Sequence, residues 1–195
     1  MEQVDRLVGG EASGDAAVRA AMTHELLPRT DSAERLAADV ASLVKNVLAS
    51  PVWKEIARGT DVKTEYSISA TLGIDYVTGT LDRLFRDADG LWTVLDYKTD
   101  ALTPATVNAR AEVYWPQLRF YAVMVGRLHR PPSIKMRILF ASLPDLPLVK
   151  EISAAELLNA EAEIGIVIGR IKAGEFAPPQ QPCRDCPFLP NGCKK

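Results

Sequence analysis

The stretch VLDYKTD, residues 94–100, most constrains what this chain can fold into, because it places an acid and a lysine in an apolar run. Such a run is otherwise typical of a buried strand. Side chains two residues apart in a strand share a face, so Asp96 and Lys98 project together while Tyr97 points to the opposite face. Burying both charges costs free energy unless other groups compensate them. The stretch therefore predicts a buried strand with a polar site on one face.

Length and charge narrow the class of protein. The chain has 195 residues, 47% of them hydrophobic, which favours one compact domain that buries its own core. A formal net charge of −2 excludes a uniformly basic nucleic-acid-binding surface but is compatible with a local basic groove around an acidic metal site. The acidic N-terminus lacks a signal-peptide block, and no apolar run reaches the roughly 18 residues that cross a bilayer. We therefore expect a cytoplasmic protein with no membrane partner.

Periodicity and turn signals predict helices at both ends of the chain and strands in the middle. A capping box of Ser153 and Glu156 is expected to begin the last helix. In their order along the chain, the elements predict an α/β fold with a mixed central β-sheet flanked by helices. The expected helices are 13–27, one from residue 31, one from Pro116 to Leu128 and one ending near Gly174; the expected strands are 62–69, 76–87, 90–99, 134–142 and 147–153.

The turn between the second and third strands sets the register of two acids. We expect residues 88–90 to form a three-residue hairpin loop with Gly90 in the left-handed conformation, which places Asp82 directly opposite Asp96. Directly paired side chains have Cβ atoms about 5 Å apart, so the two carboxylates repel unless a cation lies between them. Spacing alone leaves two interpretations open: a magnesium or manganese site beside a lysine, or a surface hairpin in which Asp82 pairs with a neighbouring Arg or Lys.

Three ordered motifs carry a family resemblance. GTLDRLF, LDYKTD and QLRFY resemble the PD-(D/E)XK nuclease superfamily in its RecB/AddA branch, the nuclease domains of bacterial helicase–nuclease recombination machines. The resemblance implies a restriction-endonuclease-like core. It also implies metal-dependent hydrolysis of DNA, exonuclease rather than endonuclease activity, and a role in double-strand break repair and recombination.

The same resemblance assigns the central site residues. The glycine–hydrophobic–Asp motif implies one metal ligand at Asp82. The Asp-x-Lys motif implies a second ligand at Asp96 and the catalytic lysine at Lys98. A main-chain carbonyl of Leu95 or Tyr97 is implied as a further ligand, at an edge of the sheet where the metal approaches. The implied cofactor is Mg²⁺ or Mn²⁺.

Four supporting positions follow from the resemblance. The family uses a histidine on an N-terminal helix as a metal ligand, which corresponds to His24. The Gln-x-x-x-Tyr motif corresponds to Gln117 and Tyr121, which are expected to meet DNA or brace the site, and Glu65 is expected to support the site from the first strand. From the residues alone, His24 is equally well a solvated helix residue, and Gln117 and Tyr121 a polar pair on an exposed helix face.

The expected partners are DNA and a helicase. The chain contains no GxxxxGK[ST] phosphate-binding loop, so it is not expected to drive ATP-dependent unwinding by itself. The resemblance implies a helicase subunit or domain as partner, with this chain either a free-standing nuclease or a piece of a larger subunit. The alternative function is that of a catalytically decayed nuclease fold that binds DNA or serves as a scaffold.

A cysteine-containing segment ends the chain. Cys183, Cys186 and Cys193 follow a Pro-rich linker, which divides the chain into a nuclease domain at 1–177 and a tail at 178–195 packed on the same domain. The tail resembles that of AddB-type nucleases, which implies a [4Fe–4S] cluster. Such a cluster and a zinc site each require four ligands, so we expect a cluster only if a fourth ligand comes from outside this chain.

Overall fold

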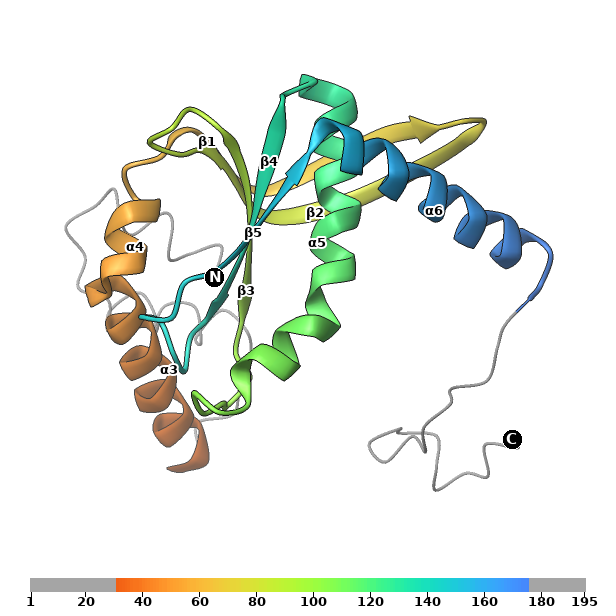
Figure 1. Ribbon diagram of the computed structural model, residues 1–195. Helices are drawn as coiled ribbons and strands as arrows, with labels where there is room; N and C mark the ends of the chain where they lie inside the picture. The colour runs from red at the N-terminus through yellow and green to blue at the C-terminus, as the bar shows by residue number, and fades with distance from the viewer. Residues whose placement is uncertain (1–30, 176–195) are drawn as a thin grey trace, which may run out of the picture.

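The structure is a computed structural model that describes residues 31–175 (Figure 1). The expected helix at 13–27, His24 and the cysteine tail therefore lie outside the described residues. Within the described range, no helix is long and apolar enough to span a membrane. The elements are α3 (Asp31–Ala49), α4 (Pro51–Ile56), β1 (Thr60–Leu72), β2 (Asp75–Arg86), β3 (Trp92–Lys98), α5 (Val107–His129), β4 (Ser133–Phe140), β5 (Leu148–Ser153) and α6 (Ala154–Lys172).

Five strands form one sheet in the order β1-β2-β3-β4-β5. Neighbouring strands are antiparallel except β3 and β4, which run parallel. A parallel pair needs a long crossover connection, and α5 provides it. The prediction of an α/β fold with a mixed central sheet is confirmed, and the arrangement is that of a restriction-endonuclease-like core.

Hydrophobic side chains pack helices on both faces of the sheet. The larger cluster joins α5 and α6 to one face of the strands and includes Val94 of β3 and Leu157 of α6. The smaller cluster packs α3 and α4 against the other face, where Leu95 of β3 meets Trp53 of α4. Figure 1 shows α3 and α4 on one side of the sheet and α5 on the other. Successive residues of β3 thus point to opposite layers, as expected for a central strand.

The loop between β2 and β3 has the predicted form. Asp87 N–H donates to Leu91 O at 3.0 Å, and Gly90 has φ of 76°. The Asp87 carboxylate accepts the N–H groups of Asp89 and Leu91, both at 3.0 Å. It also forms an ion pair with Lys135 of β4 at 2.6 Å. One carboxylate therefore fixes the turn that sets the register of the site.

We expect Asp87→Asn to lower the free energy of unfolding by about 1–3 kcal/mol at pH 7, because the carboxylate accepts charge-assisted hydrogen bonds. Burial alone would raise the pKa of Asp87, but Lys135 and the Leu91 N–H outweigh it and hold the pKa below its usual range. A lowered folded pKa gives stabilisation that is present above the unfolded value of about 3.9 and lost as the pH falls through the folded value.

Urea unfolding at pH 7 and at about pH 2 measures this difference, with the exposed Asp145→Asn as the control. The stability gap between the wild type and Asp87→Asn should close at the lower pH. A gap of equal size at both pH values would contradict the role given to the Asp87 charge.

The prediction for α5 is wrong at its N-terminus. Pro116 was expected in the first turn, but the helix begins at Val107 and contains the proline in its interior. The upstream residues Ala111 and Trp115 are buried and continue the apolar stripe of Leu118 and the residues after it. Burial of that stripe outweighs the cost of about 3 kcal/mol for an internal proline. Figure 1 shows α5 changing direction in its first half, as expected where a proline interrupts the hydrogen-bond ladder.

Helix α4 was not predicted from the sequence. Ser50 caps it by accepting the Trp53 N–H at 3.0 Å, and Pro51 occupies its first turn. Both are ordinary helix-start signals, but the helix has only 6 residues, fewer than two turns, and offers too little periodicity to detect. Its buried Trp53 and Ile56 cover the face of the sheet opposite to α5.

Candidate active site

Asp96 and Lys98 lie together at the C-terminal end of β3. Trp92 and Val94, on the same face of the strand, belong to the core beneath α5. Asp96 continues that face and is only 3% exposed. Lys98 Nζ lies 2.5 Å from Asp96 Oδ2 and forms an ion pair with it. The shared face predicted from the sequence is therefore observed, and Lys98 pairs with Asp96 rather than with Asp82.

The surroundings of Asp96 disfavour its charged form. Burial raises its pKa, the ion pair with Lys98 opposes the rise, and the nearby charge of Asp82 raises the pKa further. Among the described residues, the buried Oδ2 of Asp96 accepts no well-directed hydrogen bond. A carboxylate in this situation is stabilised by a cation placed between it and Asp82.

Asp82 lies where β2 separates from β3. The pairing of the two strands ends at Arg83 and Leu95, and the same register continued by one residue places Asp82 opposite Asp96, as the hairpin loop predicts. Asp82 Oδ2 accepts the main-chain N–H of Tyr97 at 2.7 Å. The Asp82 carboxylate thus replaces the main-chain acceptor that a strand partner would offer to Tyr97. This hydrogen bond holds the Asp82 side chain at the opening between β2 and β3.

β2 twists sharply at the same point. Leu81 and Leu84, three residues apart, both belong to the core beneath α5, whereas Phe85 belongs to the core beneath α4. The strict alternation of the strand is therefore interrupted between Leu81 and Leu84. This twist carries the distal part of the β1–β2 hairpin away from β3, which opens the sheet beside Asp96.

The expected carbonyl ligand does not lie at a sheet edge. β3 is the middle strand of five, and its pairing with β4 extends to Lys98. A metal ion could instead reach the main chain of β3 beyond Leu95, where β2 no longer pairs with it. Since the N–H and C=O of one strand residue point to the same side, the carbonyl of Tyr97 lies toward Asp82. Of the two residues expected to supply a carbonyl, the geometry favours Tyr97 over Leu95, which pairs with Arg83.

Glu65 lies on β1, at the same level as Asp82. Its neighbours Thr64 and Tyr66 pair with Arg83 and Leu81, so the register places Glu65 across from Asp82. Glu65 is exposed and has φ of 45°, a left-handed conformation that is unusual for a residue other than glycine. A strained position beside two acids is a common feature of functional sites.

Gln117 and Tyr121 of α5 face the acid–lysine pair. Gln117 Nε2 lies 3.5 Å from Asp96 Oδ1, and Gln117 Oε1 accepts from Lys98 Nζ at 3.4 Å. The same amide donates to Tyr121 Oη at 3.1 Å. Gln117 and Tyr121 thus form a polar pair, as one interpretation of the sequence expected, and the exposed Gln117 also bridges both charged groups to the helix.

Gly79 makes room for Tyr121. A Cβ at Gly79 would lie 2.8 Å from Tyr121 Cε1 and 3.7 Å from Met124 Sδ. Real Cβ atoms do not approach a ring this closely, so the ring would have to move. The glycine of the sequence motif therefore lets the ring that holds Gln117 lie directly against β2.

We expect Gly79→Ala to lower the free energy of unfolding by about 1–3 kcal/mol and to displace Tyr121. Chemical denaturation measures the first effect. The matched control is Gly169→Ala in α6, where nothing lies within 4 Å of the added Cβ and the helix should gain stability. If Gly79→Ala costs as much in a Tyr121→Leu background as in the wild type, the clash with Tyr121 is not its cause.

Sequence analysis missed a second layer of residues around Lys98. Lys98 Nζ lies 4.4 Å from the centre of the Tyr114 ring. Tyr114 Oη donates to Asp100 Oδ2 at 2.9 Å, and Arg110 Nε donates to Asp100 Oδ1 at 2.7 Å. The available signal was the spacing of Tyr114 and Gln117, which are three residues apart and therefore share a helix face.

The donors at the site suit a hard divalent cation. Within residues 31–175, no three His, Cys, Asp or Glu side chains are close enough to form a metal-binding group. The Asp82 and Asp96 carboxylates and the Tyr97 carbonyl are all oxygen donors, and Mg²⁺ commonly combines one or two carboxylates with several waters. The raised pKa of Asp96 beside the charge of Asp82 fits a site of this kind.

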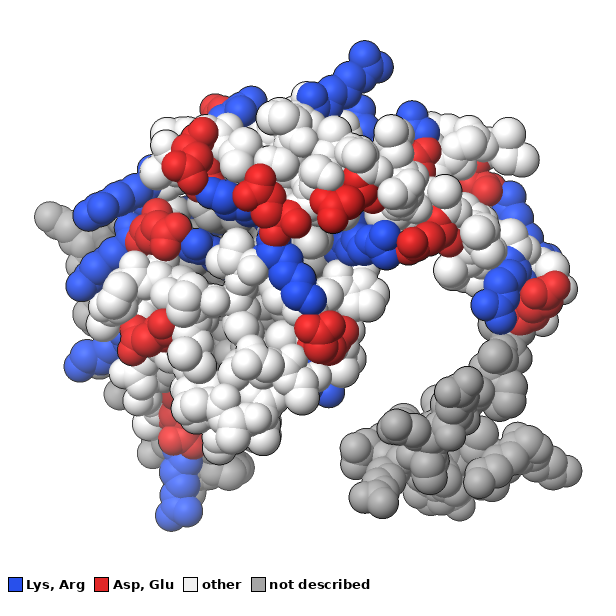
Figure 2. Space-filling view, in the orientation of Figure 1, with Lys and Arg blue, Asp and Glu red and all other residues white. Residues whose placement is uncertain are grey.

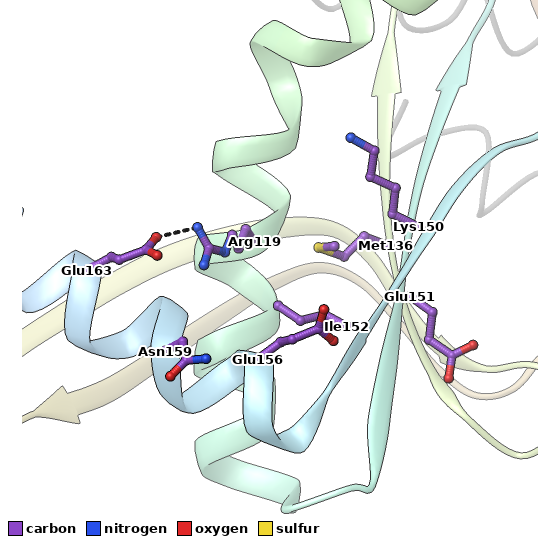
Figure 3. Close-up of a pocket in the computed structure, with 8 residues that line it drawn as sticks. All are labelled: Arg119, Met136, Lys150, Glu151, Ile152, Glu156, Asn159 and Glu163. Atoms are coloured by element: carbon purple, nitrogen blue, oxygen red, sulfur yellow. Dashed lines mark hydrogen bonds and ion pairs between the residues drawn. The ribbon is translucent and has the colours of Figure 1, made fainter.

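A separate hollow lies between α5, β5 and α6 (Figure 3). It encloses about 360 Å³. Most of its charged groups are paired: Arg119 with Glu163 at 2.5 Å, Lys150 with Glu112 at 3.0 Å, and Glu156 within the predicted capping box of Ser153. Figure 2 shows positive and negative side chains interspersed on the visible face of the molecule. The carboxylates that line the hollow are exposed, unlike the buried Asp96 beside Asp82. Its lining residues are Arg119, Met136, Lys150, Glu151, Ile152, Glu156, Asn159 and Glu163.

The fold and the site together define a class of protein: an α/β domain with a mixed sheet, opened at one point, where two carboxylates and a lysine converge. The model of the PD-(D/E)XK nuclease superfamily matches residues 1–191. The chain therefore belongs to the PD-(D/E)XK nuclease superfamily, whose members generally use divalent metal ions and act on DNA.

Comparisons with other proteins give weaker likenesses. A protein of Eubacterium rectale provisionally described as an exonuclease matches with 12% identity and a TM-score of 0.49, over 96% of this chain and 79% of its own. The protein SSO0001 matches with 17% identity and a TM-score of 0.35, over 69% of each chain. Among curated proteins, none matches the chain.

Proposed function

We propose that this protein hydrolyses DNA phosphodiester bonds with the help of Mg²⁺ or Mn²⁺ at Asp82 and Asp96. The observation that carries the proposal is the burial of Asp96 beside Asp82, with Lys98 Nζ 2.5 Å from Asp96, at the point where β2 leaves β3. Membership of a nuclease superfamily supports the same reaction.

Each residue has a defined role in this proposal. Asp82, Asp96 and the carbonyl of Tyr97 would hold the cation, which supplies polarisation of the phosphate and a lowered pKa of bound water. Lys98 positions the attacking water or neutralises charge that develops on the phosphate. Gln117 holds Lys98 and Asp96 in their relative orientation through its amide.

The finer proposal places the protein among RecB/AddA-like nucleases. Its support is the order of the motifs, with Gly79 and Asp82 on β2, Asp96 and Lys98 on β3, and Gln117 on α5. With this assignment we also propose exonuclease activity, a helicase partner and a role in double-strand break repair. His24 is proposed as a further metal ligand, and the cysteine tail as a cluster site that needs a fourth ligand from outside this chain.

A cleavage assay tests the proposed function. Linear double-stranded, linear single-stranded and closed circular DNA are each incubated with Mg²⁺, Mn²⁺ or EDTA. We expect cleavage of linear DNA with either metal and none with EDTA. Cleavage of circular DNA would favour an endonuclease, and binding of DNA without cleavage would support the decayed, non-catalytic alternative.

A further inference from the structure

We propose that Tyr114 is a positioning residue for Lys98, with its ring supporting the ammonium group and with Asp100 and Arg110 fixing the ring. The inference rests on the proposed function, because it assigns Lys98 a place in the reaction. It adds Tyr114 and Arg110, which no motif marked, and Asp100, the last residue of LDYKTD, to which no role was assigned.

The Lys98 ammonium is held from three directions. Asp96 Oδ2 lies 2.5 Å away, Gln117 Oε1 lies 3.4 Å away, and the centre of the Tyr114 ring lies 4.4 Å away. A lysine has a flexible four-carbon stem, so a single partner does not define where its charge lies. The ring attracts the ammonium group through its π-face. Unlike a second carboxylate, it does not neutralise the positive charge of Lys98.

Tyr114 is itself fixed by a network. Its Oη donates to Asp100 Oδ2 at 2.9 Å and accepts from Arg110 Nη2 at 2.8 Å. Arg110 Nε donates to the other oxygen of Asp100 at 2.7 Å, which closes a three-residue ring of hydrogen bonds. Since a tyrosine ring has only two side-chain torsions, anchoring its hydroxyl fixes the face presented to Lys98.

The network is tied to the sheet as well as to the helix. Ser142 Oγ, just beyond β4, donates to the main-chain carbonyl of Asp100 at 2.7 Å. Arg110 and Tyr114 are one turn apart on α5. The position of the Tyr114 ring therefore depends on both elements that flank Lys98, and this fits a residue that sets the place of the ammonium rather than one that merely fills space.

The test compares Tyr114→Leu with Tyr114→Phe and with Tyr66→Leu. Tyr66 is the matched control, because its ring is also half-buried and also lies 4.4 Å from a lysine, Lys63. We expect Tyr114→Leu to lower kcat about tenfold with little change in KM, since a cation–π contact in a partly desolvated site has about this effect. Tyr114→Phe keeps the ring but removes the hydroxyl that Asp100 and Arg110 hold, so its kcat should lie between those of the wild type and Tyr114→Leu. Tyr66→Leu should keep kcat within about twofold.

A spectroscopic measurement makes the result independent of cleavage. The ε-methylene resonance of Lys98, identified by its loss in Lys98→Met, should be shifted upfield by the Tyr114 ring. The shift should vanish in Tyr114→Leu and persist in Tyr66→Leu. An unmoved resonance, or an unchanged kcat in folded Tyr114→Leu, would overturn the proposal. A wild-type protein that shows the shift but cleaves no DNA would leave the contact in place and refute the proposed function instead.

Discussion

Lys98→Met should lower the DNA cleavage rate by about 10²–10³-fold while the domain stays folded. This is the effect expected when one preorganised group that stabilises transition-state charge is removed. Methionine keeps most of the length of the apolar stem and removes only the ammonium. Asp96 can then take up a proton, because burial already raises its pKa. The rate is measured with saturating Mg²⁺ and linear DNA, and folding by circular dichroism.

The control for Lys98→Met is Lys150→Met. Lys150 also lies over an aromatic ring, 4.7 Å from the centre of Trp115, and also forms an ion pair, with Glu112 at 3.0 Å. It differs in lying away from Asp82 and Asp96. We expect Lys150→Met to cleave at the wild-type rate. A Lys98→Met protein that is folded and equally active would remove Lys98 from the mechanism.

Asp96→Asn should abolish cleavage to a similar extent, and it should not lower the melting temperature. The amide keeps the shape of the side chain but no longer offers a charged oxygen to a cation. A raised pKa in the folded state means that the charged carboxylate destabilises the fold relative to a neutral one, so a neutral side chain relieves that cost.

Asp87→Asn is the control for this second substitution. Asp87 is also paired with a lysine, Lys135 at 2.6 Å, but it lies in the β2–β3 loop, on the other side of the paired residues 83–86 from the opening. Asp87→Asn should lose stability and retain activity at a temperature where it is folded, whereas Asp96→Asn should show the reverse. If Asp96→Asn loses both together, the inactivity reflects unfolding rather than a missing ligand.

The hairpin that carries the two acids was predictable because its register is set locally. A three-residue loop ending in Gly90 determines every pair that follows along β2 and β3, so the loop alone places Asp82 opposite Asp96. The shared face of Asp96 and Lys98 follows from the period of a strand. These two features brought Asp82, Asp96 and Lys98 together before any long-range contact was known, but they left open whether the three form a metal site or an ion-paired surface hairpin.

Contacts between distant elements were not predictable in the same way. Tyr114 reaches Lys98 only because α5 begins at Val107, nine residues before the expected start at Pro116, and crosses β3 at that point. The twist of β2 between Leu81 and Leu84 depends on which helix layer each side chain meets. Propensity and periodicity describe one element at a time, so they carry no information on either contact.

The steric role of Gly79 is a similar case. The sequence offers a glycine near an acid, and a glycine inside a strand signals a bulge or a close approach of another group. The structure identifies the approaching group as the ring of Tyr121, 2.8 Å from the position of a Cβ. The partner is 42 positions away along the chain, which is beyond the reach of any local pattern.

Calorimetric titration of Mn²⁺ into the metal-free protein tests the central claim most directly, because it measures the two-carboxylate site without requiring turnover. We expect the wild type to bind Mn²⁺, and Asp82→Asn and Asp96→Asn each to weaken the affinity at least about tenfold, since each removes one of two charged oxygen ligands. Wild-type affinity in both variants would contradict the account, because Asp82 and Asp96 would then not hold the metal.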